Sequence, residues 1–594
     1  MKSGGVIAKL FKTSVVSLIA AAMAAMLGMV IDGAIIGRFL GTDSMAAYGL
    51  IMPILNLATA FAGVLALGSQ VVCAQKLGAG DVKGARRAFS MTMVVTVVLS
   101  AVMITVFLIF RDPICVMLGA RGKSAHLLRL TSDYLLGLLP AFPCVLMLLE
   151  FNSLMRLDSD ANRVIVAVSV MTVLDVAGDL LNAFVFKGGM LGMGLTTSFS
   201  YFVALVILLF HFTKKDIVFR FSFKGLRMRD LGAILSTGSS SAMGSSSAML
   251  RIGIINQIMI ATALSSVAVA AFGIVNSIIS FVSGLMVGVG MTCAMIAGMI
   301  LGEQDRTAAE ALVKVTVRTV LLVSGVLAAV LLIGADLIVT LFKGDGGEEA
   351  ARLAARGLRF YAVSSIIYGV NNAFVSYTQG MRRMVLSNVY CFLQNFVFIV
   401  IPALLLSLSG LFKGENETDC VWISFIICEA LTFICIFVLA AVMKKGFPIG
   451  WKDFLFLRKG FGVPEEDLFE ASISEESQIV PASKAVAEFV ERKGANEREK
   501  MLIPLCVEEL SKNAVKHGFK DGKKHGIDVR VMRMSDGWTL RFRDNGALFD
   551  PVDWMELQES DDPDTNIGIR MVCGMAKDVQ YLSTLELNNV TIRI

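Results

Sequence analysis

The feature that most constrains the fold of this chain is a series of long apolar runs that ends near Lys444. Each run holds about 20 or more residues, the length that an α-helix needs to cross a bilayer. The pattern predicts a polytopic α-helical membrane protein with about twelve spans. The predicted spans are residues 14–37, 47–75, 88–110, 133–155, 163–186, 192–212, 238–262, 269–300, 317–342, 358–380, 387–408 and 420–443.

The composition agrees with this assignment and excludes other classes. Charged residues make up 17% of the chain and hydrophobic residues 55%, whereas soluble proteins carry about 25% charge. A net charge of +5 gives no sign of a nucleic-acid partner. The ten cysteines form no CxxC pair, so neither a zinc site nor a disulfide framework is expected.

Basic residues predict the orientation, because cytoplasmic loops of membrane proteins are enriched in Lys and Arg. If the N-terminus is cytoplasmic, most basic loops fall on one side of the membrane. We therefore expect a protein of the plasma membrane with both termini in the cytoplasm. The loop from Arg111 to Arg129 is an exception. The basic residues on the predicted cytoplasmic side are Lys2, Lys9, Lys12, Lys83, Arg86, Arg87, Arg156, Arg163, Lys214, Lys215, Arg220, Lys224, Arg227, Arg229, Arg382, Arg383, Lys444 and Lys445.

The membrane region contains an internal repeat. "AAYGLIMPI" at Ala46 matches "AAFGIVNSI" at Ala270, and "LGAGDVKGARRA" at Leu77 matches "LGEQDRTAAEAL" at Leu301, both at an offset of 224 residues. We therefore predict two parallel halves of six helices, residues 1–222 and 223–444. Two such halves typically enclose a cavity that opens to alternate sides of the membrane.

Carboxylates within the predicted spans are the first candidate site. Asp32, Glu150, Asp175 and Asp179 lie in apolar runs, where a charge costs about 2.5–3.5 kcal/mol and marks function by default. Asp175 and Asp179 share a helix face. The structural alternatives are a hydrogen bond to a neighbouring helix, or a boundary position for Glu150. Asn256 stands at the second-half equivalent of Asp32, so we expect an acidic site in the first half only.

These segments resemble the multidrug and toxic compound extrusion (MATE) transporters. The resemblance covers residues 1–444 and rests on "IDGAIIGRFLG", "KLGAGDVKGARRAF" and "VLDVAGDLLNAFVFKGGMLGMGLTTSFS". It implies export of cationic, amphipathic small molecules in exchange for H⁺ or Na⁺. The family's ion-coupling positions fall on Asp32, Asp175, Asp179 and Thr197. Asp175 stands where the family has asparagine, which leaves the choice of ion open.

The second candidate site lies in the charged region after Lys444, whose length suits one globular domain. In "VEELSKNAVKHGF", Glu509, Asn513 and His517 follow at i, i+4 and i+8 on one helix face. An amide and a carboxylate one turn apart suit a Mg²⁺-phosphate site, although a solvated helix face is the common alternative. An alternating strand then ends at Asp544 and Gly546, and Gly568 opens a further helix.

This order of motifs resembles the Bergerat-type ATPase fold of histidine kinases, gyrase and Hsp90, and most closely the anti-sigma-factor serine kinases. The resemblance covers residues 475–594 and implies an α+β domain that binds ATP with Mg²⁺. Asn513 would hold the metal, Glu509 would be the catalytic base or orient a water, Asp544 would read adenine, and Gly546 and Gly568 would line the nucleotide. The short, acidic "DDPDTNIG" lid favours binding over efficient hydrolysis.

Residues 445–474 are predicted to link the two regions. Phe454, Phe456, Leu457 and Phe461, with flanking Lys and Arg, suggest a segment on the membrane surface, in contact with lipid.

Three functions fit these observations. The first is a secondary exporter with a regulatory ATP-binding tail. The second is a membrane signalling protein whose tail is a serine kinase or anti-sigma-like partner switch for a cytoplasmic protein. The third is a flippase for lipid-linked precursors. Retained Asp32 and Asp179 favour transport, intact Glu509, Asn513 and Asp544 favour nucleotide binding, and whether the tail is an enzyme stays open.

Overall fold

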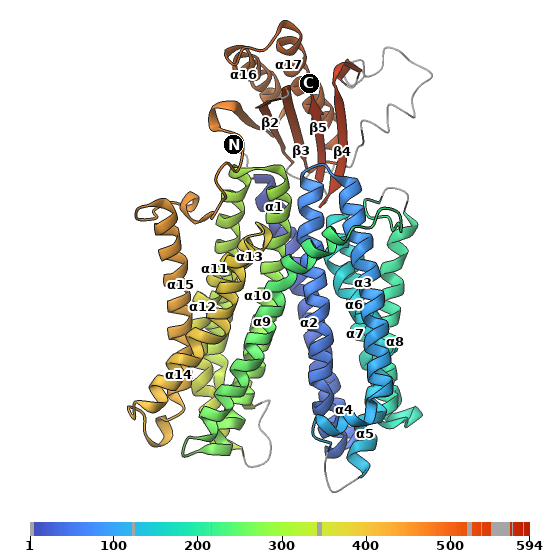
Figure 1. Cartoon of the computed structure of the whole chain (residues 1–594), viewed down its shortest axis with the longest axis vertical. Coiled ribbons are helices and arrows are strands. Elements are labelled where there is room, and N and C mark those ends of the chain that lie inside the picture. Colours follow the sequence, from blue (N-terminus) through green and yellow to red (C-terminus); the bar gives the residue numbers. More distant parts are fainter. Residues whose placement is uncertain are drawn as a thin grey trace.

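The computed structural model describes residues 5–594, except 121–124, 215–216, 341–346, 520–524, 536, 548–549, 551–570, 573 and 586. Long helices fill the membrane region, and a domain with a five-stranded sheet sits at one end of them (Figure 1). We call the two ends of the helical region the sheet side and the far side.

The first lobe contains the helices α1–α8. Their bounds are α1 Gly5–Ile35, α2 Thr42–Gly78, α3 Val82–Ile109, α4 Arg111–Met117, α5 Ala125–Leu138, α6 Ala141–Leu157, α7 Ala161–Leu181 and α8 Gly189–Leu209, with π-helical turns at Ile36–Leu40 and Asn182–Phe186. The predicted span 133–155 is broken, because α5 and α6 meet at 49°. Pro140, at the break, cannot donate a backbone hydrogen bond to a continuous helix.

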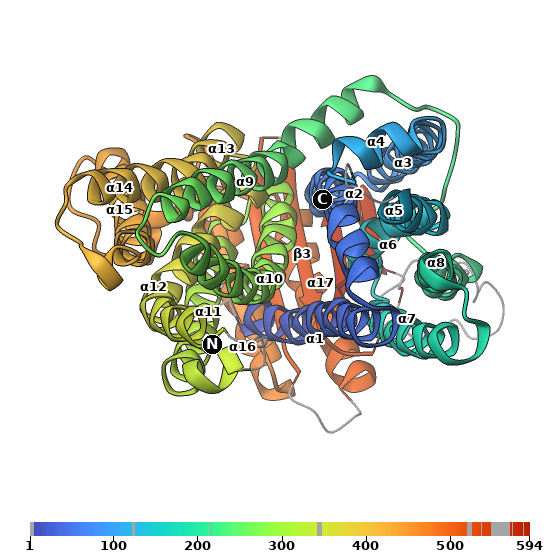
Figure 2. The same ribbon diagram turned by 90° about the horizontal axis from the view of Figure 1, so that it is seen from below.

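The second lobe contains the helices α9–α15. Their bounds are α9 Met228–Ile260, α10 Ser265–Glu303, α11 Arg306–Thr340, α12 Glu348–Gly380, α13 Met384–Phe392, α14 Phe398–Leu408 and α15 Asp419–Lys444, with a π-helical turn at Leu393–Val397 joining α13 to α14. Seen along the helices, the two lobes form separate groups, with α1 between them (Figure 2).

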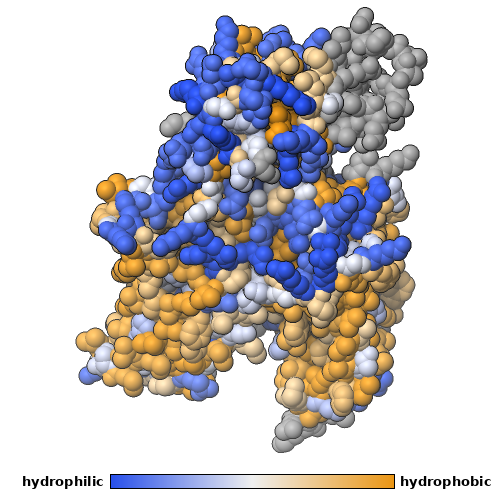
Figure 3. All heavy atoms as spheres, turned by 45° about the horizontal axis from the view of Figure 1, so that its top comes forward, coloured by the Kyte–Doolittle hydropathy of each residue, from blue (hydrophilic) through white to orange (hydrophobic). Residues whose placement is uncertain are grey.

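Among the described residues, eight helices are long and apolar enough to cross a membrane, or nine if the bent pair α5–α6 counts as one span. Three further long helices, α1, α9 and α12, run beside them and fill the remaining predicted spans. The prediction of a polytopic helical membrane protein is confirmed. Figure 3 shows the apolar surface around these helices and hydrophilic residues at the sheet side.

The lobes pack closely at the sheet side. A Cβ atom on Gly78 of α2 would lie 2.1 Å from the carbonyl oxygen of Met299, and one on Gly302 of α10 would lie 2.0 Å from that of Gln75. Only glycine permits these backbones to approach so closely. On the far side the space-filling view shows an open gap between the lobes (Figure 3).

The C-terminal domain is an antiparallel sheet in the order β1-β2-β3-β5-β4. Two helices, α16 (Ile479–Arg492) and α17 (Glu497–Asn513), cover one face. The strands are β1 Leu468–Ile473, β2 Ile527–Met534, β3 Gly537–Asp544, β4 Asp578–Thr584 and β5 Leu587–Arg593. Apolar side chains such as Val529, Val531, Leu540 and Phe542 face the helices and form the domain core.

The segment predicted to be a linker has more structure than expected. Its last residues form β1, which pairs with β2. The rings of Phe454 and Phe456 pack at an angle against Phe374 of α12, and Leu455 and Phe456 are buried. These apolar residues therefore pack against the protein, which differs from the surface position predicted for them.

Candidate functional site

The predicted carboxylates Asp32, Asp175 and Asp179 lie together in the first lobe. Asp32 comes from α1 and the other two from α7, and all three are buried. Thr196 of α8 donates a hydrogen bond of 2.6 Å to Asp179 Oδ1, and Ser200 donates one of 3.1 Å to Asp175 Oδ1. Three helices thus contribute to one polar cluster inside an apolar lobe.

Hydrogen bonds within the protein leave this cluster incomplete. Asp32 Oδ1 and Asp179 Oδ2 are buried and have no hydrogen-bond partner among the described residues. The carboxyl groups of Asp32 and Asp179 lie within side-chain hydrogen-bonding reach of each other. Two carboxylates this close repel each other unless a proton or a cation is shared between them. The arrangement can therefore take up and release a small positive charge.

The sequence identified only part of the cluster on α8. Thr197 lies within side-chain hydrogen-bonding reach of Asp175, close to where the resemblance placed it. Thr196 and Ser200 were missed, although their spacing of i and i+4 in "TTSFS" places both hydroxyls on the helix face that meets α7.

Two further carboxylates are buried in the membrane region. Glu150 of α6 accepts a hydrogen bond from Thr96 of α3. In the second lobe, Asn371 and Gln394 each donate a 2.8 Å hydrogen bond to Glu429 Oε2. The second half therefore also holds a buried carboxylate, which the sequence analysis did not identify. The signal for Glu429 was a single carboxylate within the apolar run "FIICEALTF".

The second candidate site lies at one end of the sheet in the C-terminal domain. Asp544, the last residue of β3, is buried, and its Oδ1 accepts hydrogen bonds from Asn588 Nδ2 and from the backbone of Gly546, each 2.9 Å long. Burial raises the pKa of Asp544, and these two bonds oppose that rise. Its Oδ2 accepts no hydrogen bond from the described residues, so it can accept one from a ligand.

The end of the α17 helix lies beside this carboxylate. Ala547 donates a backbone hydrogen bond of 3.0 Å to the carbonyl of Gly518, in the π-helical turn Ala514–Gly518 that follows α17. A Cβ atom on Gly546 would lie 3.0 Å from the same carbonyl oxygen, so a larger residue would force the two segments apart. The fold therefore joins the Glu509/Asn513 helix to the Asp544/Gly546 loop.

Glu509 and Asn513 are partly exposed on this helix. Glu509 Oε1 lies 4.0 Å from Lys512 Nζ, and no hydrogen bond joins the side chain of Asn513 to another described residue. Amide and carboxylate oxygens of this kind can bind Mg²⁺ or its water ligands. Gly568 lies outside the described residues, and of His517 only the backbone is described.

The sheet face opposite α16 and α17 lies on the sheet side of both lobes. Arg530, Arg541 and Arg543, which we call the arginine cluster, point away from the domain core. Arg530 Nη1 lies 2.7 Å and Arg541 Nη2 3.2 Å from Asp305 Oδ2, and Arg543 pairs with Glu303. Glu303 is the last residue of α10 and Asp305 lies just before α11, and these five side chains are almost fully buried. The second lobe is thus joined to the sheet by ion pairs.

The first lobe meets the sheet through neutral contacts at the hairpin tip, Thr584–Leu585 between β4 and β5. Leu585 donates a 3.4 Å backbone hydrogen bond to Leu157 at the end of α6. The hydroxyls of Ser159 and Ser583 lie 3.5 Å apart. A cavity of about 400 Å³ remains between the hairpin and the α2–α3 turn. This contact is less complete than the one with the second lobe.

Comparison with protein families places both regions. The family model described as MatE matches residues 18–181 and 242–405. The two matches begin 224 residues apart, the same offset as the sequence repeats. The model described as Histidine kinase-like ATPase domain matches residues 473–594.

Individual proteins and structures agree with these family matches. A probable multidrug resistance protein, YoeA of Bacillus subtilis, is 23% identical over 376 residues, which cover 60% of this chain and 78% of that protein. The multidrug export protein MepA of Staphylococcus aureus is 22% identical over 419 residues, 69% of this chain and 88% of that one. A solved outward-facing MATE transporter of the MOP superfamily superposes with a TM-score of 0.68 at 19% identity, over 75% of this chain and 98% of that one.

Proposed function

This chain belongs to the MatE family, and from that premise we propose that it is an ion-coupled exporter of cationic or amphipathic small molecules. It would exchange them for H⁺ or Na⁺ and would be regulated by an ATP-binding C-terminal domain. The observation that carries the transport proposal is the buried carboxylate cluster of Asp32, Asp175 and Asp179, with oxygens that lack partners.

The position of this cluster supports a coupling role. Asp32 lies on α1, which contacts α7 of its own lobe and α10 and α11 of the other. A proton or Na⁺ bound between Asp32 and Asp179 would cancel their repulsion and stabilise the local packing of α1 against α7. Release of that ion would restore a negative charge that attracts a cationic substrate. The ion and a cationic substrate would therefore compete for the negative charge of this cluster in the first lobe.

The distribution of basic residues supports a cytoplasmic sheet side. Lys83 lines a cavity together with residues of β4, and Lys444 pairs with Asp453 in the segment that leads to the C-terminal domain. The gap between the lobes would then face the cell exterior, and the lobes would be closed toward the cytoplasm. To accept a substrate from the cytoplasm, the lobes must separate at the sheet side.

The C-terminal domain is well placed to control that separation. Its sheet contacts both lobes, so the hairpin tip must leave Leu157 and Ser159 when the lobes part. Asn588 of β5 bonds Asp544 at the nucleotide site and Tyr581 of β4. A nucleotide bound at Asp544 would therefore act on the same hairpin that touches the first lobe.

The residues of the domain fit ATP with Mg²⁺. Asp544 would accept a hydrogen bond from adenine, Gly546 would allow the backbone to approach the base, and Asn513 and Glu509 would hold the metal and its water. ATP bound with Mg²⁺ would be a charged ligand that orders this end of the domain.

Transport in proteoliposomes tests the proposal. We expect the full-length protein to move ethidium, a cationic amphipathic dye, under an imposed pH or Na⁺ gradient, and Asp32→Asn to abolish the coupled movement. Asp133→Asn is the matched control, because Asp133 lies outside the cluster and pairs with Arg129. Equal gradient-driven movement by Asp32→Asn and wild type would refute the coupling role. The gradient that drives the dye identifies the ion.

A further inference from the structure

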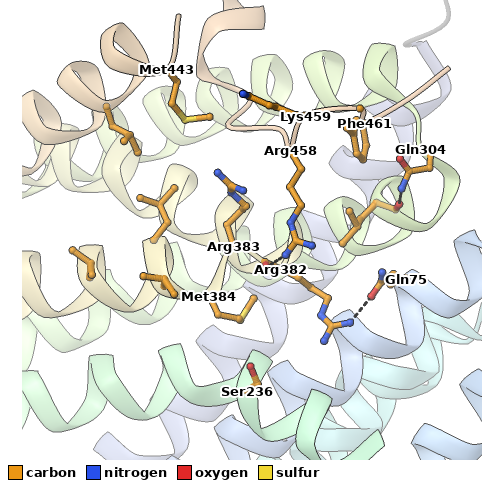
Figure 4. Close-up of a pocket in the computed structure, with 16 residues that line it drawn as sticks. Gln75, Ser236, Gln304, Arg382, Arg383, Met384, Met443, Arg458, Lys459 and Phe461 are labelled. Carbon is orange, nitrogen blue, oxygen red and sulfur yellow. Dashed lines mark hydrogen bonds between the residues drawn. The ribbon is translucent and has the colours of Figure 1, made fainter. Parts of the chain in front are cut away.

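A basic pocket of about 930 Å³ lies at the sheet side of the second lobe. The turn between α12 and α13, the helix α15 and the segment after it form its walls, and Gln75 of α2 closes one end (Figure 4). Four cationic residues line it: Arg382, Arg383, Arg458 and Lys459. None of its described lining residues is Asp or Glu, so the pocket carries a concentrated positive charge.

Two of these cations make hydrogen bonds to neutral groups of the described residues. Arg382 Nη1 donates a 2.8 Å hydrogen bond to Gln75 Oε1, and Arg458 Nη2 donates one of 3.4 Å to the carbonyl of Arg382. Burial, and then the nearby charge of Arg458, lower the pKa of Arg382. Arg383 and Lys459 have no ion pair among the described residues. The side chains therefore repel one another, and a bound anion would relieve that repulsion.

The corresponding turn of the first lobe indicates that the fold does not require these arginines. There α6 and α7 are joined through Ser159, whose φ of 56° matches the φ of 51° at Arg382. The flanking residues are Asp158 and Asp160, and they bind His211 at 2.9 and 2.8 Å. The first-lobe turn thus satisfies its charges within the protein, whereas the second-lobe turn leaves them available to a ligand.

The remaining wall of the pocket is apolar and continues into the membrane region. Val385 and Val389 of α13 and Met443 of α15 line it, and Val385 is 80% exposed. These helices belong to the last two apolar spans. A soluble phosphate would use only the cationic end, whereas a phospholipid would place its headgroup there and its acyl chains along α13 and α15.

We propose that this pocket binds the phosphate headgroup of an anionic phospholipid from the leaflet next to the C-terminal domain. Because Gln75 of the first lobe and Arg458 of the segment after α15 both meet Arg382, the lipid would bind where both lobes and the C-terminal segment join. This site is separate from the carboxylate cluster and the nucleotide site, so its failure would leave the transport proposal intact.

Native mass spectrometry of the full-length protein in detergent, titrated with phosphatidylglycerol or phosphatidylcholine, tests the site. We expect wild type to prefer phosphatidylglycerol, and Arg383→Gln/Lys459→Gln to bind it at least about tenfold more weakly, since each lost cation removes one charge contact. Lys224→Gln/Arg227→Gln, which removes two exposed charges on the same side, is the matched control and should bind like wild type. Arg383→Lys/Lys459→Arg keeps the charge and should keep the preference.

Three results would overturn the proposal. They are equal binding of the two lipids by wild type, equal phosphatidylglycerol affinity in wild type and the Arg383→Gln/Lys459→Gln variant, and displacement of the lipid by inorganic phosphate at the same concentration. The last result would assign the cations to a soluble anion. Unchanged melting temperatures in all variants confirm that a lost preference reflects the site and not misfolding.

Discussion

At the scale of single residues, the two candidate sites differ in how their carboxylates are held. Asp544 has one oxygen fixed by hydrogen bonds from Asn588 and Gly546, which leaves its other oxygen as an acceptor in a fixed orientation. Asp32 and Asp179 instead each leave a buried oxygen without a partner. The first arrangement suits recognition of a fixed donor, and the second suits reversible uptake of an ion.

We predict that Asp544→Asn weakens adenine-nucleotide binding by the full-length protein. The amide would present N–H donors where adenine also presents one, so a favourable bond becomes an unfavourable contact, at a cost of about 1.5–3 kcal/mol, or about 10- to 100-fold in affinity. Titration calorimetry with ATP and Mg²⁺ measures this loss. Asp467→Asn is the control, because Asp467 pairs with Lys493 and is not part of the candidate nucleotide site, and this variant should bind ATP as wild type does. An unaltered affinity in Asp544→Asn would rule out the adenine assignment.

We predict an acid-sensitive contribution to stability from Asp160, which lies before α7. Burial alone would raise its pKa, but hydrogen bonds from His211, Lys214 and Arg163 lower it from its usual value of 3.8 to about 2. A lowered carboxyl pKa stabilises the fold above the unfolded value, and this stabilisation is lost as pH falls from about 4 to about 2.

Asp160→Asn should therefore lower the free energy of unfolding by about 1–2 kcal/mol at pH 7. Thermal unfolding of both proteins over a pH series provides the check. The difference between them should shrink below pH 4, and a difference that stays constant down to pH 3 would contradict the role of the charge.

At the scale of elements, the turn between α10 and α11 differs from its repeat in the first lobe. Asp305 accepts a hydrogen bond from Ala308 N, as Asp81 does from Gly84 N. In the second lobe this turn also carries Glu303, in place of Ala79, and pairs with the arginine cluster. One copy of the repeat has thus become an attachment point for the sheet.

We predict that Arg543→Glu detaches the sheet from the second lobe. It would leave Glu303 buried beside a like charge, and breaking a buried pair costs about 3–5 kcal/mol. Hydrogen exchange of β2 and β3 should rise markedly. The double variant Arg543→Glu/Glu303→Arg should recover much of the protection. Arg593→Glu, on an exposed position of β5, is the control. Unchanged exchange in Arg543→Glu would mean that the pairs do not hold the sheet.

Much of this element-level picture is predictable from sequence, and the exceptions have physical causes. Hydropathy and the 224-residue offset identify the spans and the repeat because they depend on local composition. The alternation of apolar and polar residues in "IDVRVMRM" and "WTLRFRDN" predicts two strands. It does not indicate which residues pair with the arginines on their polar face. Glu303 and Asp305 lie more than 220 residues away, and that pairing depends on the tertiary fold.

The candidate sites were predictable to a similar extent. The resemblance pointed to Asp32, Asp175 and Asp179, which lie in one buried cluster, and to Asn513 and Asp544, whose segments meet through the hydrogen bond from Ala547 to Gly518. Their roles stay predictions. Glu429 and Ser200 were missed, because the partners of a buried polar residue are known only once the helices pack.

At the scale of the whole molecule, the sheet contacts both lobes at their closed end, while the far side is open (Figures 1 and 3). Opening at the sheet side requires the hairpin tip to leave the first lobe, because the second lobe is the one held by ion pairs. The weaker of the two contacts is therefore the one expected to break during transport.

We predict that Ser159→Cys/Ser583→Cys, once oxidised, blocks export. The two hydroxyls lie 3.5 Å apart, a separation that two cysteine sulfurs can close when they bond. The crosslink would hold the lobes together at the sheet side. Dye movement in proteoliposomes should stop on oxidation and resume after reduction, and each single cysteine variant should be insensitive to both treatments. Full export by the crosslinked protein would show that the contact does not need to open.

The unequal attachment of the sheet has a practical consequence. The domain is held to the second lobe by ion pairs and makes weaker contacts with the first lobe. It should therefore move with the second lobe and change its distance to the first. A fluorescent donor on β4 and an acceptor on the α2–α3 turn would change their energy transfer at every turnover. We therefore expect this distance to report the position of the first lobe without a label in the carboxylate cluster.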